Sequence, residues 1–386
     1  MNYELTEEQQ AIVEIAKQIA DEKILPIREE YDEGQIFPNE IVEILAKSDL
    51  YRVFVPEEYD GLGMGIFEMS LVTEELSRVC GGIALAYAGS ALGAFPILLY
   101  GSEEQKKKFL PSIASGEKIA AFALTESEAG SDASNVRTTA TKEGDHYILN
   151  GTKQWITNGG VAGVHSVFAT VDPTRGIRGM TAFIVDSETE GLEIGKKENK
   201  LGIRASETVE LIFNNCKIPA ENLIGREGTG FRVAMGTFDQ SRPGVAAQAL
   251  GIAQGAMEAA LSYAQERIQF GSKIYSFQAI RFMIADMAIK IEAARALIYN
   301  VSKLIDSGAK NTGGYSAMAK TFASDVAMEV TTDAVQVLGG YGYMKEYPVE
   351  KMMRDAKITQ IFEGTNQIQR EVIASHLAKE LSRLRK

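Results

Sequence analysis

Apolar residues recur at helical spacing through the first 119 residues. A capping-box pattern at residues 6–9 is followed by apolar positions three or four residues apart, at Ile12, Ile15, Ala16 and Ile19. This pattern predicts a helix that begins almost at the first residue. Segments 41–46 and 69–76 are also amphipathic, and a glycine-rich stretch at 60–65 separates them. Residues 1–119 are therefore predicted to form a mostly helical domain.

Residues 79–102 contain no charged side chain, which formally makes this stretch a candidate membrane span. Its composition favours another structure, because small residues dominate it, Pro96 interrupts it and no basic residues bias one flank. We predict a buried helix whose small side chains leave room for a ligand. A buried helix without a pocket is the alternative.

From residue 120 the period changes to that of strands. Short strand-like runs occupy residues 120–125, 146–150, 164–171, 181–185 and 209–213. Asn-Gly sequences at 150–151 and 158–160 are predicted turns. The pattern predicts an antiparallel β-barrel-like domain at 120–230. A dinucleotide-binding Rossmann unit is excluded, because strands and helices do not alternate and no Gly-x-Gly-x-x-Gly follows a strand.

Helical periodicity returns after residue 230 and continues to the end. The helical segments are 231–266, 277–303, 315–338 and the stretch from 363 onward. Four long helices in succession predict a four-helix bundle at 231–386. The predicted fold class is α+β multidomain: a helical N-terminal domain, a middle β-domain and a C-terminal bundle.

Charge and composition exclude some functions. Asp and Glu number 52 against 40 Lys and Arg, for a net charge of −12, and so acidic a chain argues against nucleic-acid binding. The two cysteines and three histidines lack metal-ligand spacing, so no metal site is predicted. No basic leader with an apolar core is seen, so we expect a cytoplasmic (prokaryotic) protein that is not bound to a membrane.

Glu363 is the candidate for acid–base chemistry. Ile361 and Phe362 precede it, Gly364 follows it, and Thr365 is a predicted helix N-cap. A helix start also suits a pyrophosphate, because its N–H groups are unpaired. The apolar neighbours should raise the pKa of this carboxylate and the helix start should lower it, and the sequence does not decide between them. A buried glutamate at an ordinary helix entrance is the alternative.

Five motifs follow one another along the chain. They are Thr-Glu-x-x-Ala-Gly-Ser-Asp at 125–132, Trp-Ile-Thr-Asn-Gly-Gly at 155–160, Arg-Ile-Gln-Phe-Gly at 267–271, Gln-Val-Leu-Gly-Gly-Tyr-Gly at 336–342 and Ile-Phe-Glu-Gly-Thr at 361–365. The motif at 155–160 lies at the predicted start of a strand. In this order and on this architecture, the chain resembles the acyl-CoA dehydrogenase family over essentially its whole length. The short- and medium-chain enzymes are the nearest subgroup.

The resemblance implies an FAD cofactor held by the β-domain and by the last helix start. The implied contacts are Phe122, Leu124, Thr125, Gly130, Ser131, Trp155, Ile156, Thr157, Thr365 and Gln367. Trp155 would cover one face of the flavin, Thr125 would hydrogen-bond to the ring, and Thr157 would donate toward N5. A lone tryptophan is otherwise more often a core residue.

A second implied set serves the flavin of a neighbouring subunit. These residues are Arg267, Phe270, Gln278, Gln336 and Gly340. The resemblance therefore implies a homotetramer in which neighbouring subunits share each flavin site.

Members of this family place the catalytic base at one of two positions. One matches Glu363, and the other matches Ser241, which cannot serve as a carboxylate. The resemblance thus implies that Glu363 removes the α-proton of an acyl-CoA thioester while the β-hydrogen leaves as hydride to flavin N5, giving the 2,3-enoyl-CoA. The Glu363 N–H and a flavin hydroxyl would bind the thioester oxygen.

The implied substrate contacts are Ser131, Asp239, Arg242, Phe362 and Gly364. An ion pair inside the bundle is the alternative for Asp239 and Arg242. Ile83 lies where glutaryl-type relatives carry an arginine, which disfavours a dicarboxylic acyl group. Straight, branched and cyclic acyl groups all remain open, and an electron-transferring flavoprotein is the expected electron acceptor.

Three other functions are weighed against this one. An acyl-CoA oxidase would share the fold, but oxidases are usually longer. A non-catalytic flavin-binding or DNA-associated relative is disfavoured by the acidic charge and the retained Glu363. A purely structural helical protein would be colourless.

Overall fold

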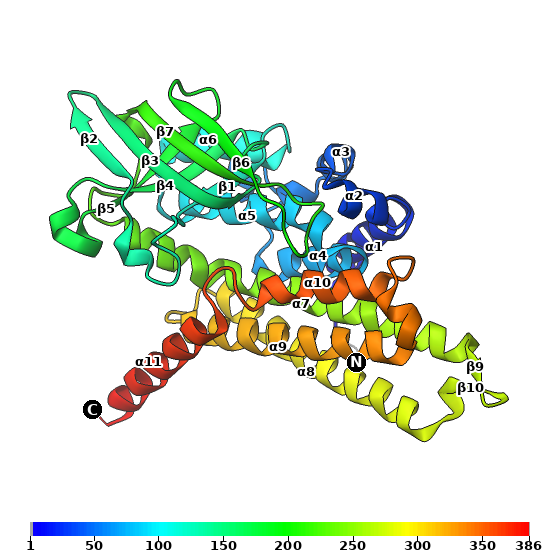
Figure 1. The fold of residues 1–386 in the computed structure, drawn as a ribbon. Coiled ribbons are helices and arrows are strands. Elements are labelled where there is room, and N and C mark those ends of the chain that lie inside the picture. The colour runs from blue at the N-terminus through cyan, green and yellow to red at the C-terminus, as the bar shows by residue number, and fades with distance from the viewer. Residues whose placement is uncertain (1–2, 386) are drawn as a thin grey trace.

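The computed structural model describes residues 3–385 of the chain. Figure 1 shows three parts: N-terminal helices in blue, a sheet in cyan and green, and long C-terminal helices from yellow-green to red. The predicted order of helical, β and helical parts is confirmed. The exact domain limits, near residues 119 and 230, stay predictions.

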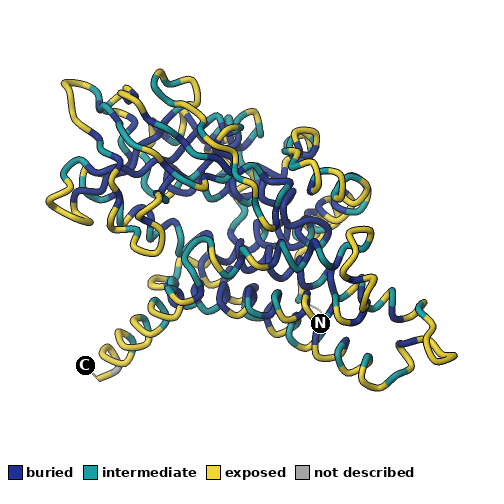
Figure 2. The backbone as a smooth tube through the Cα atoms, viewed as in Figure 1, coloured by how far each residue is buried: buried dark blue, intermediate teal, exposed yellow. Residues whose placement is uncertain are grey.

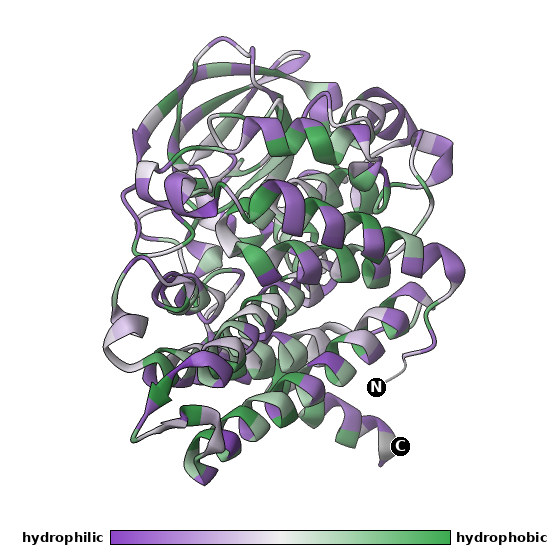
Figure 3. Ribbon diagram, turned by 90° about the vertical axis from the view of Figure 1, so that its right-hand side faces the viewer, coloured by the Kyte–Doolittle hydropathy of each residue, from purple (hydrophilic) through white to green (hydrophobic). Residues whose placement is uncertain are grey.

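Six α-helices make up the N-terminal part: α1 (Glu7–Ile19), α2 (Arg28–Gly34), α3 (Asn39–Lys47), α4 (Ile66–Val79), α5 (Gly81–Tyr100) and α6 (Glu103–Ala114). The predicted capping box at the start of α1 is present, since the Gln9 N–H donates to the Thr6 hydroxyl at 3.2 Å. Figure 3 shows green and purple residues on the same helices, as expected of helices that bury one face.

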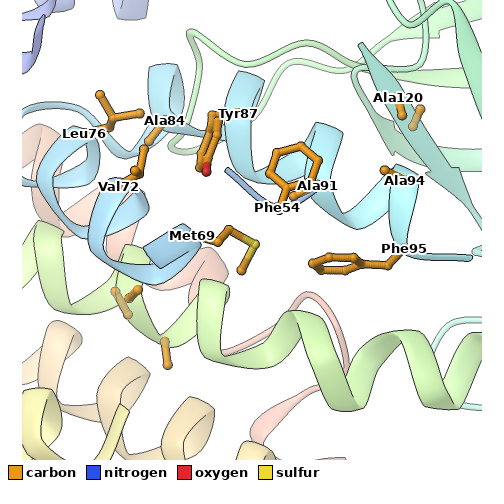
Figure 4. Close-up of a cluster of buried hydrophobic side chains, with 14 of the residues drawn as sticks. Phe54, Met69, Val72, Leu76, Ala84, Tyr87, Ala91, Ala94, Phe95 and Ala120 are labelled. Carbon is orange, nitrogen blue, oxygen red and sulfur yellow. The ribbon is translucent and has the colours of Figure 1, made fainter. Parts of the chain in front are cut away.

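Helix α5 is the uncharged stretch, and it lies inside the protein. It is the one helix among residues 3–385 that is long and apolar enough to cross a membrane, yet 78% of its most apolar window is buried. Its small residues let the sheet approach: a Cβ at Gly93 would lie 2.5 Å from the Ala121 nitrogen. Figure 4 shows Ala91 and Ala94 of this helix facing the same buried cluster as Ala120. The prediction of a buried helix is confirmed.

The sheet of the middle part is mixed rather than purely antiparallel. Its strands are β1 (Ala120–Ala123), β2 (Thr139–Glu143), β3 (His146–Thr157), β4 (Val164–Thr170), β5 (Met180–Asp186), β6 (Leu192–Lys197), β7 (Thr208–Pro219) and β8 (Leu223–Ile224). The order is β6-β7-β3-β2-β4-β5-β8, and β1 pairs with β4. The β1–β4 and β2–β4 pairs are parallel. These pairings depend on contacts distant in sequence, which a strand pattern does not encode.

Two local predictions in this part are wrong. Asn150 and Gly151 do not form a turn; they lie inside β3, where the register shifts as in a β-bulge. Strands β2 and β6 were missed, because their sequences are too polar to show alternating apolar residues. The predicted turn at 158–160 is present.

The C-terminal part contains five helices instead of four. They are α7 (Gly230–Glu266), α8 (Gln278–Asp306), α9 (Gly313–Leu338), α10 (Pro348–Thr359) and α11 (Asn366–Leu384), and a hairpin of β9 (Ile268–Gln269) and β10 (Ser272–Lys273) joins α7 to α8. The unforeseen α10 packs on α7 and α9. Helix α11 crosses the start of α9 and extends away from the other helices toward the C-terminus (Figure 1). Figure 2 shows the deepest burial where α4, α5 and α7 meet, and exposed backbone along α11.

Candidate active site

A cavity of ≈ 340 Å³ lies where the sheet, α5, α7 and the loop between α10 and α11 meet. Its size is within the usual range for ligand pockets. The cavity is lined by twelve of the residues predicted from the sequence: Phe122, Leu124, Thr125, Gly130, Ser131, Trp155, Ile156, Thr157, Arg242, Phe362, Glu363 and Gly364. Three separate parts of the chain therefore contribute to one site.

The loop that carries Glu363 has an unusual backbone. Glu363 has φ +52° and Gly364 has φ +96°, and a left-handed conformation is uncommon for a glutamate. Glycine is favoured at 364 because other residues rarely adopt this φ, and a Cβ there would also lie 2.6 Å from the Gln369 amide nitrogen. The loop ends at the predicted N-cap, where the Thr365 hydroxyl accepts from the Ile368 N–H at 3.3 Å.

Three side chains hold Glu363 in this conformation. The Ser241 hydroxyl donates to its carboxylate. The Arg242 Nε and the Gln369 Nε2 donate to its backbone carbonyl at 3.4 Å and 3.1 Å. The Glu363 N–H makes no hydrogen bond within the described part of the chain, so it is free to bind a ligand oxygen. The loop thus offers a carboxylate and an unpaired donor side by side.

Burial decides the pKa of Glu363, which the sequence left open. Desolvation raises the pKa of this carboxyl group above its ordinary value. The Ser241 hydrogen bond and the charges of Arg242 and Lys320 act in the opposite direction, but they do not cancel it. A raised pKa brings a carboxylate closer to the range that suits a general base.

The two family positions for the base are neighbours in space. Ser241, at the second position, contacts Glu363 from 122 residues away in the sequence. Asp239 does not line the cavity. Its carboxylate lies 3.6 Å from Arg242 Nη1, so the two residues form a partly exposed ion pair, which is the alternative to their role as substrate contacts. Arg242 also lies over the Phe238 ring, 5.4 Å from its centre.

Trp155 lies at the end of β3, not at the start of a strand as predicted. The register of β3 shifts between Lys153 and Ile156, and Trp155 itself has φ +59°. A β-bulge re-aims a side chain in this way. The indole is 54% exposed and borders the cavity, so Trp155 is not a core residue.

A buried ion pair behind this wall was missed by the sequence analysis. Lys153 Nζ lies 2.7 Å from Glu126 Oε1 and also donates to the Leu124 carbonyl at 3.0 Å. The Glu126 carboxylate accepts the backbone N–H groups of Arg137 and Thr138 at 2.6 and 3.0 Å. The pair thereby joins the segments that carry Thr125, Ser131 and Trp155. Its glutamate is part of the 125–132 motif, which was the one available signal.

Lys320 of α9 was also missed. It is fully buried, and its Nζ donates to the Gly364 carbonyl and to Asn366 Oδ1, both at 2.9 Å. A lysine among the small residues of α9 was the only sequence signal for this contact.

The remaining predicted residues lie in other places. Thr365 and Gln367 line a second hollow on the other side of the same loop, together with Asp325 and Arg370. Arg267, Phe270 and Gly340 line a third hollow beside the β9–β10 hairpin. Gln278 begins α8, and Gln336 lies in the last turn of α9, so neither lines the main cavity.

The main cavity has the features that a flavin needs. An exposed indole faces it, the hydroxyl-bearing residues Thr125 and Thr157 border it, and a Cβ at Gly130 would meet no atom within 4 Å. A flat aromatic wall and an open glycine suit a ring system with a phosphate tail. The desolvated carboxylate of Glu363 lines the same cavity. The fold and the site together define a flavin-dependent oxidoreductase.

The comparisons with known proteins agree with this class. The models for the N-terminal, middle and C-terminal domains of acyl-CoA dehydrogenase match residues 6–117, 121–216 and 228–378. The chain belongs to the acyl-CoA dehydrogenase family, and its cofactor is FAD.

Three relatives illustrate the similarity. Probable acyl-CoA dehydrogenase FadE25 of Mycobacterium tuberculosis is 49% identical, over 98% of this chain and 97% of that protein. The butyryl-CoA dehydrogenase structure from Megasphaera elsdenii has a TM-score of 0.95 at 45% identity, covering 98% of this chain and 100% of the other. A chain in a structure described as the electron transferring flavoprotein of Acidaminococcus fermentans has a TM-score of 0.95 at 49% identity, covering 98% and 99%.

Proposed function

We propose that Glu363 is the base in an FAD-dependent α,β-dehydrogenation of an acyl-CoA thioester to the 2,3-enoyl-CoA. The observation that carries this proposal is the position of Glu363: it lines the same cavity as Trp155 and Thr157, and the pKa of its carboxyl group is raised. Acyl-CoA dehydrogenation is the activity of the family.

The chain supplies the acid–base half of the reaction. The α-proton passes to the Glu363 carboxylate, and negative charge then develops on the thioester oxygen. The unpaired Glu363 N–H supports this role, because one such donor is typically worth about 3 kcal/mol in the transition state. Bound FAD supplies the acceptor for the β-hydrogen.

The residues that would hold FAD fall into two groups. Those of the same chain line the cavity or the loop after it: Phe122, Leu124, Thr125, Gly130, Ser131, Trp155, Ile156, Thr157, Thr365 and Gln367. The second group, Arg267, Phe270, Gln278, Gln336 and Gly340, would come from a neighbour. The exposed side chain of Phe270, with 95% of its surface accessible, supports contact with a second copy. A homotetramer, as the resemblance implies, is part of this proposal.

The cavity favours a short, uncharged acyl group. Met69, Phe95 and the buried Gln248 line it, and α5 contributes no charged residue. Figure 4 shows Met69 and Phe95 close together above α7. A butyryl group fits this description, and one of the relatives is a butyryl-CoA dehydrogenase. A cyclic acyl group is the second candidate, because a relative 47% identical to the chain is a cyclohex-1-ene-1-carbonyl-CoA dehydrogenase. The proposed substrate contacts are Ser131, Arg242, Phe362 and Gly364, which line the cavity, and Asp239, which does not line it but is paired with Arg242.

An electron-transferring flavoprotein is the proposed acceptor, in the cytoplasm. The support is the similarity to a chain in a structure described by that name. In the alternative, an acyl-CoA oxidase, oxygen is the electron acceptor. Formation of one peroxide per acyl-CoA oxidised would identify that activity.

Anaerobic titration of the yellow protein with acyl-CoA esters tests the function. Butyryl-CoA, octanoyl-CoA, a cyclic acyl-CoA and glutaryl-CoA are added in turn while flavin absorbance is recorded. We expect butyryl-CoA or the cyclic ester to bleach the flavin, and glutaryl-CoA to leave it oxidised. A flavin that no ester bleaches would contradict the proposal.

A further inference from the structure

Lys320 is a buried cation without an anionic partner. Both hydrogen-bond acceptors of its ammonium group, the Gly364 carbonyl and Asn366 Oδ1, are neutral oxygens. Buried lysines are normally paired, because an isolated charge is costly to desolvate. The other fully buried lysine of the described residues, Lys153, follows this rule through Glu126. An uncompensated ammonium beside the base therefore calls for an explanation.

Lys320 fixes the loop on both sides of Gly364. Its bond to the Gly364 carbonyl reaches the residue directly after the base, and its bond to Asn366 reaches the first turn of α11. The Asn366 amide in turn donates to Ser324 and Asp325 of α9, both at 2.8 Å. The loop is thus anchored to α9, while Gln369 and Arg242 hold it from within α11 and from α7.

The other charges near Glu363 are paired with opposite ones. Arg242 of α7 lies 3.6 Å from Asp239, and Asp325 of α9 lies 3.0 Å from Arg370 of α11. Arg242 has the larger effect on the pKa of Glu363, and Lys320 adds a second positive charge that has no ion-pair partner among the described residues. Its charge acts on Glu363 in the direction of the ionised form.

We infer that Lys320 is a positioning residue for the base: it clamps the Glu363–Gly364 loop to α9 and, together with Arg242, supplies positive charge that favours the carboxylate form of Glu363. This inference rests on the proposed role of Glu363 as the base. Lys320 lines no part of the cavity, so it acts through Glu363 and does not touch the substrate.

The charge of Lys320 is itself sensitive to pH. Burial lowers the pKa of its ammonium group to about 7, against the raising effect of Glu363. In acidic solution Lys320 is charged and its field acts on Glu363. In alkaline solution it loses its proton and that field disappears, while the neutral amine keeps hydrogen-bond donors for the loop.

The test compares Lys320→Met and Lys320→Gln with the wild-type holoenzyme. Methionine removes both charge and donors at similar length, whereas glutamine removes the charge and keeps a donor. The rate of flavin bleaching by a saturating acyl-CoA is measured against pH. For Lys320→Met we expect a rate loss of about tenfold in acid and a rise of the acid midpoint by about one pH unit, with the difference from wild type shrinking in alkali.

A second measurement does not depend on turnover. The infrared band of the protonated Glu363 carboxyl, assigned by its absence from Glu363→Gln, is titrated in each variant. Its midpoint should rise by the same amount in Lys320→Met and Lys320→Gln. Flavin content, taken from the absorbance spectrum, should stay at the wild-type level.

Thr331→Val is the matched control, because Thr331 is a fully buried residue of the same helix whose hydroxyl bonds only to helix carbonyls, at 2.7 Å to Ala327 and 3.3 Å to Met328. It should not displace the pH midpoint. A Lys320→Met enzyme with wild-type rate and midpoint would overturn the inference, as would a rate loss with no displacement in either lysine variant. If Lys320→Met does not fold, Lys320→Gln decides alone by its midpoint. Failure of the proposed function is seen separately, as a Glu363→Gln enzyme that bleaches at the native rate.

Discussion

Two glutamates near the same cavity show how the fold assigns opposite roles to one side chain. Glu126 directly follows Thr125 of the cavity lining, and Glu363 itself lines the cavity. Lys153 and two backbone N–H groups lower the pKa of Glu126 despite its burial. Glu363 has one hydroxyl donor and no cation within ion-pair distance among residues 3–385, so desolvation raises its pKa.

The comparison teaches that the hydrogen-bond and ion-pair partners of a carboxylate, more than its burial, decide whether its pKa is lowered, as in a structural group, or raised, as in a reactive one. A fully paired carboxylate stays ionised and rigid, while a desolvated carboxylate with few partners is ready to take a proton. Both residues lie in motifs of the sequence, at 125–132 and 361–365, and the motifs alone do not tell them apart. The four predictions below test this difference.

Glu363→Gln should have the largest effect. The amide cannot accept the α-proton, so bleaching of the flavin by acyl-CoA should slow by about 10³-fold, within the usual range for a general base. Stopped-flow absorbance measures the rate. Flavin content serves as the control and should be unchanged, and a rate near that of the wild type would place the base elsewhere.

Glu126→Gln should mainly reduce stability. It leaves Lys153 buried without an anion, and breaking a buried pair in this way costs about 3–5 kcal/mol. Urea unfolding of the flavin-free protein gives the free energy of unfolding. The double variant Glu126→Gln, Lys153→Met should recover part of the loss, because it removes the unpaired charge; a double variant less stable than Glu126→Gln would contradict this account.

The two glutamates should make stability depend on pH in opposite ways. The raised pKa of Glu363 means that its contribution is complete below the pKa of the unfolded chain and is lost as pH rises through the folded value. Glu363→Gln should therefore melt at a higher temperature than wild type at neutral pH, and the difference should vanish in acid. The lowered pKa of Glu126 means that its contribution is lost as pH falls, so Glu126→Gln should approach wild type in acid. Calorimetry across pH checks both slopes, and parallel slopes would refute the contrast.

Ser241→Ala should have the smallest effect. It removes the single hydroxyl that donates to the Glu363 carboxylate, a hydrogen bond worth about 1.5–3 kcal/mol for a charged acceptor. Bleaching should slow several-fold in acid, and the acid midpoint should rise because the ionised form loses a donor. Ser241→Thr, which keeps a hydroxyl, is the control and should retain most of the rate. A lower midpoint in Ser241→Ala would show that the hydroxyl favours the protonated form instead.

Local patterns in the sequence were enough to predict much of the fold. The capping box at Thr6, the N-cap at Thr365 and the small-residue helix α5 depend on neighbours a few residues apart, and all three are present. The order of helical, β and helical parts follows from the same periodicities. The resemblance supplied the twelve residues that meet at the cavity, because each motif carries its own positions.

Long-range packing settled the rest. The parallel β1–β4 pair and the bulge that turns Trp155 toward the cavity have no local signal. Helix α10 was missed although Pro348 at its first turn and its amphipathic pattern were available signals. The contacts of Glu363 with Ser241, and of Gly364 with Lys320, join residues 122 and 44 positions apart. A pKa depends on solvent exclusion and on charges brought together in space. Residue types along the chain therefore named the candidate base, and only the folded arrangement fixed the direction of its pKa shift and its partners.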